Sequence, residues 1–356
     1  MMSDRKKATD GRAVKATAKR VTMKDVARLA GVSQPTVSFV LSDRRDVSVA
    51  PATRERVLKA AEELKFQPNR AAQSLRSNKS FTIGVIAEGV VSEPYAGKIV
   101  LGVQQAVQAS GYVCFVVETS DTRDAGRAAV ENLVKQGVAG LIYATPGAFP
   151  VRAVEISEET PTVFVNCWPT NLDDAVVVLA DEYQGGRDAA AATFAAGHRH
   201  VVFLGGPWGD YACRERERGM VDAAIASGID PATIRREYGT YQVSSGHDLA
   251  VKVLAEEAPT ALICGNDRMA VGALLAVHSA GLECPGDVSI VGFDDQPDLA
   301  DQLSPPLTTV ALPHLTMGQV AGALLLDGQK SRGRHLVPCR YIERGSLVAP
   351  RAEGPR

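Results

Sequence analysis

The sequence predicts an α + α/β protein, in which a small helical head precedes a long α/β body. Three features predict this class: a basic segment at the N-terminus, short helices within that segment, and alternating strands and helices after about residue 80. The chain has 356 residues and a hydrophobic content of 45%, which is typical of an ordinary globular protein of two or three domains.

Charge is distributed unevenly along the chain. Residues 1–79 contain 18 Lys and Arg against 8 Asp and Glu, and the remaining residues contain 21 against 33. The formal net charge of −2 therefore combines a head of +10 (18 − 8) with a body of −12 (21 − 33). Only the head is expected to bind a polyanion.

The composition argues against several other classes of protein. No apolar run reaches the ~18 residues that span a membrane, and the basic, polar residues 1–20 favour a disordered tail over a secretory signal. Six scattered cysteines without a CxxC pair favour reduced, buried thiols in a cytoplasmic protein. His198 and His200 stand alone before a predicted strand, so we expect a loop or packing role for them, and we expect no metal and no cofactor.

The first predicted helix of the head follows Thr22. Thr22 is a good N-cap, and Asp25 three residues later can complete a capping box. Gly31 ends the helix and allows a tight turn. The residues expected on its buried face are Val26, Leu29 and Ala30.

Two further helices complete the head. Ser33 can cap the second helix and Pro35 suits its first turn. The residues that this helix is expected to bury are Val37, Val40 and Leu41. A third helix over 51–64 is expected to bury Val57, Leu58, Ala61 and Leu64. Three short helices with a glycine turn between the first two predict a helix-turn-helix, whose second helix would present small polar side chains to the major groove of DNA.

Two segments of the head resemble a known family. TMKDVARLAGVSQPTVSFVLS (22–42) and TRERVLKAAEELKFQPNRAAQSLRS (53–77) are similar to the lactose-repressor (LacI/GalR) family of bacterial transcription regulators, and the resemblance extends from about Val21 to about Pro350. The resemblance implies that the family's DNA-contacting positions are occupied by Ser33, Gln34, Thr36, Val37, Ser38 and Phe39. It also implies that phosphate-contacting or neighbouring positions are occupied by Thr22, Ser42 and Asn69.

One of these positions departs from the family pattern. Phe39 stands where many members carry Arg or another polar residue. A phenyl ring neither donates nor accepts hydrogen bonds, so we expect an apolar contact at this position, such as with a thymine methyl group.

The segment PNRAAQSLRS (68–77) resembles the family's hinge. Such a segment is only marginally helical in isolation. In the family, two hinges become helices together in the minor groove, where a leucine from each wedges between base pairs. Leu75 occupies that position and Ala72 lies one turn earlier, which agrees with the general chemistry of apolar wedges that kink DNA.

The body alternates apolar and helical segments, which predicts parallel α/β sheets. The expected strands are TIGVIA (82–87), YVCFVV (112–117), AGLIYA (139–144), TVFVN (162–166), VVVLA (176–180), VVFLGG (201–206), TALICGND (260–267) and VSIVGFDD (288–295). Helical segments include 97–111, 123–137 and 185–197. The run is long enough for two lobes, in which ligands bind at the carboxyl ends of strands.

Polar residues follow several of these strands, whereas common catalytic motifs are absent. The sequence has no GxGxxG after a strand, GxxxxGK[ST], GxSxG or HExxH, so no catalytic residue is expected. Asn166, Asn266 and Asp294 lie at strand ends, and Arg216 lies on the helix after 201–206. Their guanidinium, carboxylate and amide groups suit the donor–acceptor pairs of a polyol. Each residue alone is as well explained by a cap or a solvated loop, but their convergence favours a pocket.

The family resemblance adds roles for these residues. It implies a periplasmic-binding-protein-like body of two lobes joined by crossing strands, with RxxG (216–219), ND (266–267), GFDD (292–295) and the recrossing segment PPLTTV (305–310) as matching motifs. It implies that effector hydroxyls are held by Arg216, Asp294 and Asn166. It further implies that Tyr95, Tyr241 and His314 line the apolar side, while Asn266 supports its neighbours.

The expected domain boundaries follow from both arguments. They are a basic tail (1–20), a helix-turn-helix domain (21–67), a hinge helix (68–79) and an effector-binding and dimerisation domain (80–356). The N-terminal lobe is expected at about 80–178 and 312–338, and the C-terminal lobe at about 179–311 and 339–350. Family tetramers carry a C-terminal heptad helix, for which AEGPR after Arg351 leaves no room, so we expect a homodimer.

These features together predict a regulator that binds double-stranded DNA at a near-palindromic operator. We expect a repressor released by a small sugar-like effector, with no membrane partner. Five alternatives remain open: a purine or nucleoside effector, a corepressor, an activator instead of a repressor, a DNA-binding dimer without a ligand response, and an enzyme.

Overall fold

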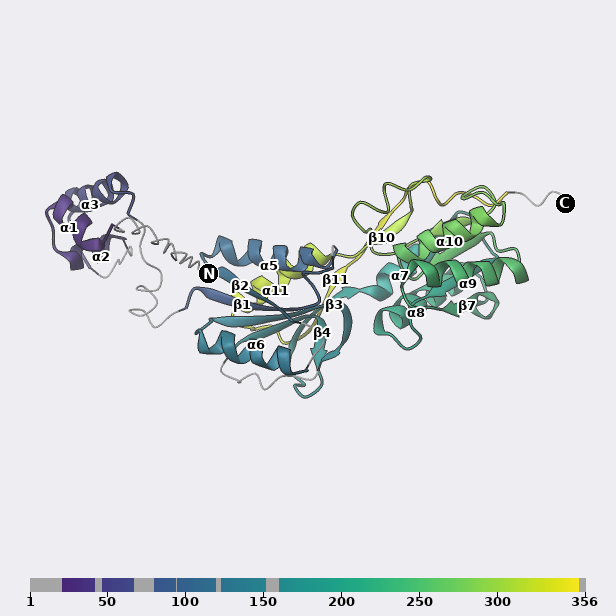
Figure 1. The fold of residues 1–356 in the computed structure, drawn as a ribbon, viewed down its shortest axis with the longest axis horizontal. Coiled ribbons are helices and arrows are strands. Elements are labelled where there is room, and N and C mark those ends of the chain that lie inside the picture. Colours follow the sequence, from purple (N-terminus) through teal and green to yellow (C-terminus); the bar gives the residue numbers. More distant parts are fainter. Residues whose placement is uncertain are drawn as a thin grey trace, which may run out of the picture. The chain divides into compact units, whose positions relative to one another are not determined.

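The computed structural model describes residues 21–41, 47–66, 80–93, 95–119, 123–151 and 160–351. The chain divides into two compact units, Met1–Lys79 and Ser80–Arg356 (Figure 1). The predicted tail and hinge lie outside the described residues, as do four predicted DNA-binding residues: Ser42, Asn69, Ala72 and Leu75.

The first unit contains the three helices that the sequence predicts. They are α1 (Met23–Ala30), α2 (Gln34–Leu41) and α3 (Pro51–Glu63). The backbone N–H of Thr22 donates to Asp25 Oδ2 at 2.9 Å as part of a capping box, and Gly31 ends α1 with φ 63°. The backbone N–H of Thr36 donates to Ser33 Oγ at 3.3 Å, so the predicted caps of both short helices are confirmed.

The buried faces of α1 and α3 differ from the prediction. Leu29 is 47% exposed and Leu58 is 49% exposed, so neither belongs to the core. Ala27 and Ala60 are buried in their place, around Val26, Val37 and Val57. Short helices that pack closely favour alanine between their backbones, and a leucine then fits only at the rim.

The second unit begins with a fully parallel six-stranded sheet in the order β11-β5-β4-β3-β1-β2. Its strands are β1 (Thr82–Glu88), β2 (Val113–Thr119), β3 (Gly140–Val151), β4 (Thr162–Pro169), β5 (Val176–Asp181) and β11 (Gly333–Pro338). The helices α5 (Gly97–Ala109) and α11 (His314–Leu326) cover one face, and α6 (Arg123–Lys135) covers the other (Figure 1). We call this sheet and its three helices the N-terminal lobe.

A second parallel sheet follows in the order β7-β6-β8-β9. Its strands are β6 (Val201–Gly205), β7 (Arg235–Tyr238), β8 (Ala261–Cys264) and β9 (Ser289–Val291). The helices α7 (Glu182–Ala195) and α8 (Tyr211–Ala226) pack on one face, and α9 (Val243–Glu256) and α10 (Asp267–Ser279) pack on the other. We call this sheet and its four helices the C-terminal lobe.

The chain crosses between the two lobes three times. It passes from β5 directly into α7, from β10 (Thr309–Ala311) to α11, and from β11 into β12 (Arg340–Ile342). The last two crossings pair as an antiparallel ladder between β10 and β12. The predicted two-lobed α/β fold with parallel sheets is confirmed.

β10 overlaps the expected recrossing segment 305–310, eight further strands were predicted, and β7, β11 and β12 were missed. These three have no continuous apolar run, because most of their residues are half-buried or exposed. His198 packs as expected, with Nδ1 2.9 Å from Thr260 Oγ1 and Nε2 2.7 Å from the carbonyl oxygen of Val348. Among the described residues, none of the helices is long and apolar enough to cross a membrane.

Candidate functional site

A cavity of about 260 Å³ lies between the two lobes, where the carboxyl ends of strands from both sheets converge. Six of the seven residues predicted to bind an effector line this cavity: Tyr95, Asn166, Arg216, Tyr241, Asn266 and Asp294. The fold therefore brings together predicted residues that are distant along the chain. The crossing of parallel strands at one edge explains this convergence.

Backbone conformation also marks this cavity. Seven non-glycine residues in the described part of the chain have a positive φ. Three of them line the cavity: Asn166 (58°), Tyr241 (63°) and Asp294 (113°). Residues held in such sparsely populated conformations are concentrated at functional sites.

Arg216 is positioned by the close packing of α8 against α7. A Cβ atom on Gly186 would lie 2.2 Å from the carbonyl oxygen of Arg216, and one on Gly219 would lie 2.1 Å from that of Tyr183. The glycine of the RxxG motif is therefore needed for the two helices to touch. Their contact brings Glu182, the first residue of α7, against Arg216.

The guanidinium group of Arg216 is buried and largely engaged within the protein. Its Nε donates to Glu182 Oε2 at 2.8 Å, and NH1 donates to the carbonyl oxygen of Gly265 at 2.5 Å. NH2 lies 3.8 Å from Asp294 Oδ1, and Cζ lies 3.7 Å from the ring centroid of Phe293. A buried charge held by several partners in this way forms a rigid group with a fixed orientation.

Two buried aspartates lie beside this arginine. Burial raises the pKa of Asp294 to about 6, although the charge of Arg216 opposes the rise. Burial and the charge of Asp294 raise the pKa of Asp267 to about 7. Asp267 accepts hydrogen bonds from the Thr309 hydroxyl group (2.6 Å) and the backbone N–H of Gln296 (2.8 Å), which favour its ionised form.

Asn266 and Tyr241 support each other at one wall of the cavity. Asn266 Oδ1 accepts the backbone N–H of Met269 at 2.8 Å and so caps α10, while its Nδ2 donates to the carbonyl oxygen of Tyr241 at 3.1 Å. The Tyr241 hydroxyl group donates to Asp210 Oδ2 at 2.9 Å. The amide of Asn266 is therefore used within the C-terminal lobe, as a supporting role requires.

Asn166 lies inside β4 rather than at its end. It was predicted to end a strand over 162–166, but β4 continues to Pro169. The pairing of β4 with β3 shifts its register between Ala144 and Phe149, and Asn166 lies at that irregularity. Its backbone carbonyl oxygen accepts the Thr145 hydroxyl group at 2.9 Å. An interrupted ladder directs the residue toward the cavity and permits its positive φ.

His314 lies behind the cavity wall instead of lining it. Its ring centroid is 5.6 Å from that of Tyr95, which does line the cavity. Burial, with the nearby charges of Lys98 and Arg216, lowers the pKa of His314 to about 4, so the ring is neutral at physiological pH. Burial raises the pKa of Tyr95 to about 12, which keeps its hydroxyl group protonated.

Four charged lining residues were not predicted from the sequence: Glu93, Glu182, Asp210 and Arg268. Glu93 follows β1 in the N-terminal lobe, and its Oε2 lies 2.8 Å from NH2 of Arg268 on α10 of the C-terminal lobe. This ion pair, which we call the interlobe latch, joins the two lobes across the cavity. Glu182, Asp210 and Arg268 all follow predicted strands within a few residues, so the signal that found Asn266 applies to them too.

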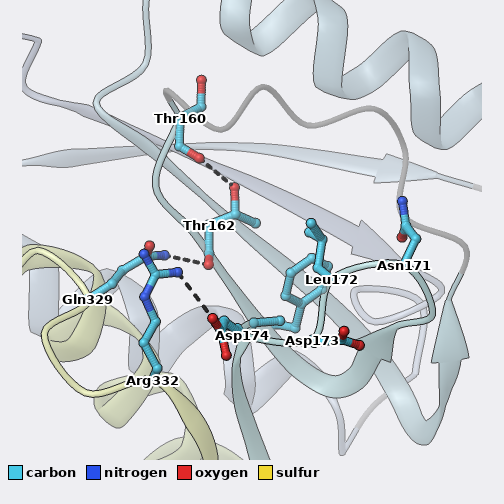
Figure 2. A pocket seen from close by; sticks show the side chains of 10 residues that line it. Thr160, Thr162, Asn171, Leu172, Asp173, Asp174, Gln329 and Arg332 are labelled. Atoms are coloured by element: carbon cyan, nitrogen blue, oxygen red, sulfur yellow. Dashed lines mark hydrogen bonds between the residues drawn. The ribbon is translucent and has the colours of Figure 1, made fainter.

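A second hollow, of about 550 Å³, lies at the opposite edge of the N-terminal lobe sheet (Figure 2). Its wall is formed by residues before and at the start of β4 and β5, including Thr162 and Asp174. Arg332 NH1 donates to the carbonyl oxygen of Asp174 at 3.4 Å, and Gln329 Nε2 donates to that of Thr162. The side chains of Arg332 and Gln329 are thus tied to the backbone, and the hollow lies at the amino ends of the strands, away from the predicted residues.

In the head, α2 leaves part of its surface open. Ser33 and Gln34 are exposed, Thr36, Ser38 and Phe39 are half-buried, and Thr22 at the start of α1 is exposed. Val37 is fully buried in the core of the head. The expectation that Val37 contacts DNA is therefore wrong, because the side chain that seals the three-helix core cannot also reach a groove.

Comparisons with known proteins agree with this architecture. A model of the lacI family of bacterial regulatory proteins matches residues 22–69, and a model of the periplasmic binding protein-like domain matches residues 190–347. The lactose operon repressor of Escherichia coli (strain K12) is 32% identical over 345 residues, which cover 94% of this chain and 93% of that repressor. The HTH-type transcriptional repressor PurR of Aliivibrio fischeri (strain ATCC 700601 / ES114) is 31% identical over 319 residues, covering 87% and 92%.

A solved structure is similar over both units. The lac repressor dimer bound to operator and the anti-inducer ONPF matches with a TM-score of 0.75 and 31% identity, covering 93% of this chain and 100% of that one. The matches run through the helical head, both lobes and the cavity between them. The chain belongs to the lacI family of bacterial regulatory proteins.

Proposed function

We propose that this lacI-family DNA-binding regulator is a repressor that a small, sugar-like effector releases from its operator. The observation that carries the proposal is the convergence of predicted polar residues from both lobes on one cavity between the lobes. Hydroxyl groups of a sugar can donate to Asp294 and accept from NH2 of Arg216, while Tyr95 and Tyr241 offer apolar faces. One relative is named for the lactose operon, which is in keeping with a sugar effector.

The head is proposed to bind a near-palindromic double-stranded operator through α2. Ser33, Gln34, Thr36, Ser38 and Phe39 are the residues whose side chains we assign to DNA, and Thr22 is assigned to a phosphate. The hinge residues Ala72 and Leu75, with Ser42 and Asn69, keep their predicted roles. Because its partner is chromosomal DNA, we expect the protein to act in the bacterial cytoplasm.

An exposed edge strand supports a homodimer. β2 ends the six-stranded sheet, and Val113, Phe115 and Val116 on it are 46%, 49% and 42% exposed. Leu101, on α5 beside β2, is also exposed. An apolar edge strand is an association surface unless something covers it, and a second copy of the chain would cover it symmetrically. Light scattering at micromolar concentration should give a dimer mass, whereas a stable monomer or tetramer would reject this assembly.

The proposed switch couples the cavity to the hinges of the dimer. An effector that contacts both lobes changes their relation, and the two hinges then separate and lose the partner that each needs to stay helical. Coupling of this kind amounts to about 1–3 kcal/mol, and reciprocity requires operator DNA to weaken effector binding by the same factor.

The test is a pair of titrations, of operator with and without effector and of effector with and without operator, over a panel of sugars and nucleosides. Release by a sugar supports the proposal. Release by a nucleoside would mean that the effector is a nucleoside instead of a sugar. Stronger operator binding in the presence of the ligand would mean that the protein depends on a corepressor. Product analysis of the same mixtures tests the alternative of an enzyme.

A further inference from the structure

Acidic side chains outnumber basic ones around the interlobe cavity. Four carboxylates line it, those of Glu93, Glu182, Asp210 and Asp294, against the two guanidinium groups of Arg216 and Arg268. Ionised, these six groups carry a formal charge of −2 (2 − 4). The cavity therefore has more hydrogen-bond acceptors of full charge than donors.

Both guanidinium groups are already neutralised by a carboxylate. Arg216 Nε donates to Glu182 at 2.8 Å and its NH1 to a backbone carbonyl oxygen at 2.5 Å, so two sides of its planar fork are occupied. NH2 of Arg268 lies 2.8 Å from Glu93. An anionic group would have to share either guanidinium with the glutamate that already neutralises it.

Among these carboxylates, Glu182 has the strongest influence on the arginine at the centre of the cavity. Its side chain is 6% exposed, like that of Arg216, so solvent screens their interaction very little. Its position is fixed because it is the first residue of α7, which packs on α8 through Gly186 and Gly219. A phosphate or carboxylate brought to Arg216 would therefore meet the Glu182 carboxylate at the same place.

We propose that Glu182 makes this cavity selective for uncharged polyhydroxy ligands over their phosphorylated or carboxylated counterparts. A hydroxyl group donates to the surplus carboxylates without repulsion, whereas an anion meets like charge in a desolvated site. The inference rests on the proposed function, because it concerns the class of effector that the same cavity binds.

The experiment measures binding to the full-length protein by calorimetry and thermal shift, using matched sets. The probes are glucose, glucose 6-phosphate and glucuronate, ribose and ribose 5-phosphate, and adenosine and AMP. For the set that binds, we expect each anionic member to bind at least about 100-fold more weakly than its uncharged counterpart. Glu182→Gln keeps an oxygen acceptor for Arg216 Nε but removes the charge. It should reduce the difference in affinity between the uncharged and the anionic ligand at least about tenfold.

Glu131→Gln is the matched control, because it removes the same charge from an exposed side chain on α6 far from the lining residues; it should leave the difference in affinity unchanged. If Glu182→Gln does not fold, Glu93→Gln, at the half-exposed latch, should reduce the difference in affinity by a smaller factor.

An anionic member that binds the natural protein as tightly as its uncharged counterpart overturns the selectivity while leaving a ligand-binding regulator intact. A difference in affinity that persists in a folded Glu182→Gln protein removes this residue from the explanation. Failure of the whole panel to bind rejects the proposed function, and this inference with it.

Discussion

The head and the interlobe cavity hold their functional side chains in opposite ways. In the head, Val26, Val37 and Val57 form a small core, and α2 keeps polar residues at its surface. In the cavity, Arg216 and Asp294 are themselves buried and partnered. Surface residues on a preformed helix can be changed without loss of the fold, whereas buried charges are part of what keeps the lobes folded. Stability and binding should therefore separate in the head and change together in the cavity.

Arg216→Ala is expected to have the largest effect. It leaves Glu182 and Asp294 buried without their cation, which should destabilise the second unit by about 3–5 kcal/mol. It should also abolish the response to effector while operator affinity without effector stays nearly intact. Denaturant unfolding and the paired titrations measure the two effects. Arg218→Ala, on the exposed side of the same helix, is the control and should change neither; a normal effector response in Arg216→Ala would remove this residue from the switch.

A pH dependence should arise from the buried aspartate pair. The pKa of Asp267 is raised from 3.8 to about 7 in the folded protein, so between pH 4 and 7 the unfolded state loses a proton that the folded state keeps. The contribution of this group to the free energy of unfolding must therefore fall as the pH rises through that window.

Asp267→Asn tests this pH dependence. The difference in unfolding free energy between the natural protein and the variant should decrease from pH 4 to pH 7 and then level off. Asp248→Asn, at an exposed position, should give no such slope. A difference that is constant or that rises with pH would contradict the assignment.

Two substitutions in the head should separate stability from DNA binding. Val37→Ala opens a cavity in the core and should cost about 2 kcal/mol, seen as faster hydrogen exchange in α1, α2 and α3. Gln34→Ala should leave the free energy of opening measured by hydrogen exchange unchanged within about 0.5 kcal/mol. It should weaken specific operator binding by about 1–3 kcal/mol. If Gln34→Ala loosens the head, or Val37→Ala weakens binding without loosening it, the proposed division is wrong.

The interlobe latch should give the smallest effect. Arg268 and Glu93 side chains are 27% and 36% exposed, so a double-mutant cycle of Arg268→Met and Glu93→Gln should give a coupling of at most about 1 kcal/mol. Because the latch joins the lobes, its loss should also weaken effector binding by about fivefold or less. A coupling as large as that of a buried pair would mean that the latch and the Arg216 cluster act as one network.

Prediction from the sequence succeeded best where one short segment carried the signal. Thr22, Gly31 and Ser33 defined the ends of the two short helices because capping depends on residues three or four apart. Long apolar runs identified the central strands, whereas β7 and β11 were missed because their residues are only partly buried. Asn166, Asn266 and Asp294 were predicted because they follow such runs. Glu182 and Arg268 follow such runs too, but they were not predicted.

The sequence by itself determined the class of each element, the basic head, the acidic body and the position of polar residues at strand ends. These depend on local periodicity and composition, which a single segment contains. Only the tertiary structure decided that Leu29 is exposed rather than core, that His314 lies behind Tyr95, and that Glu182 pairs with Arg216, 34 residues away. Such contacts depend on how helices cross and where glycines let them touch, and the spacing of residues along the chain does not encode that geometry.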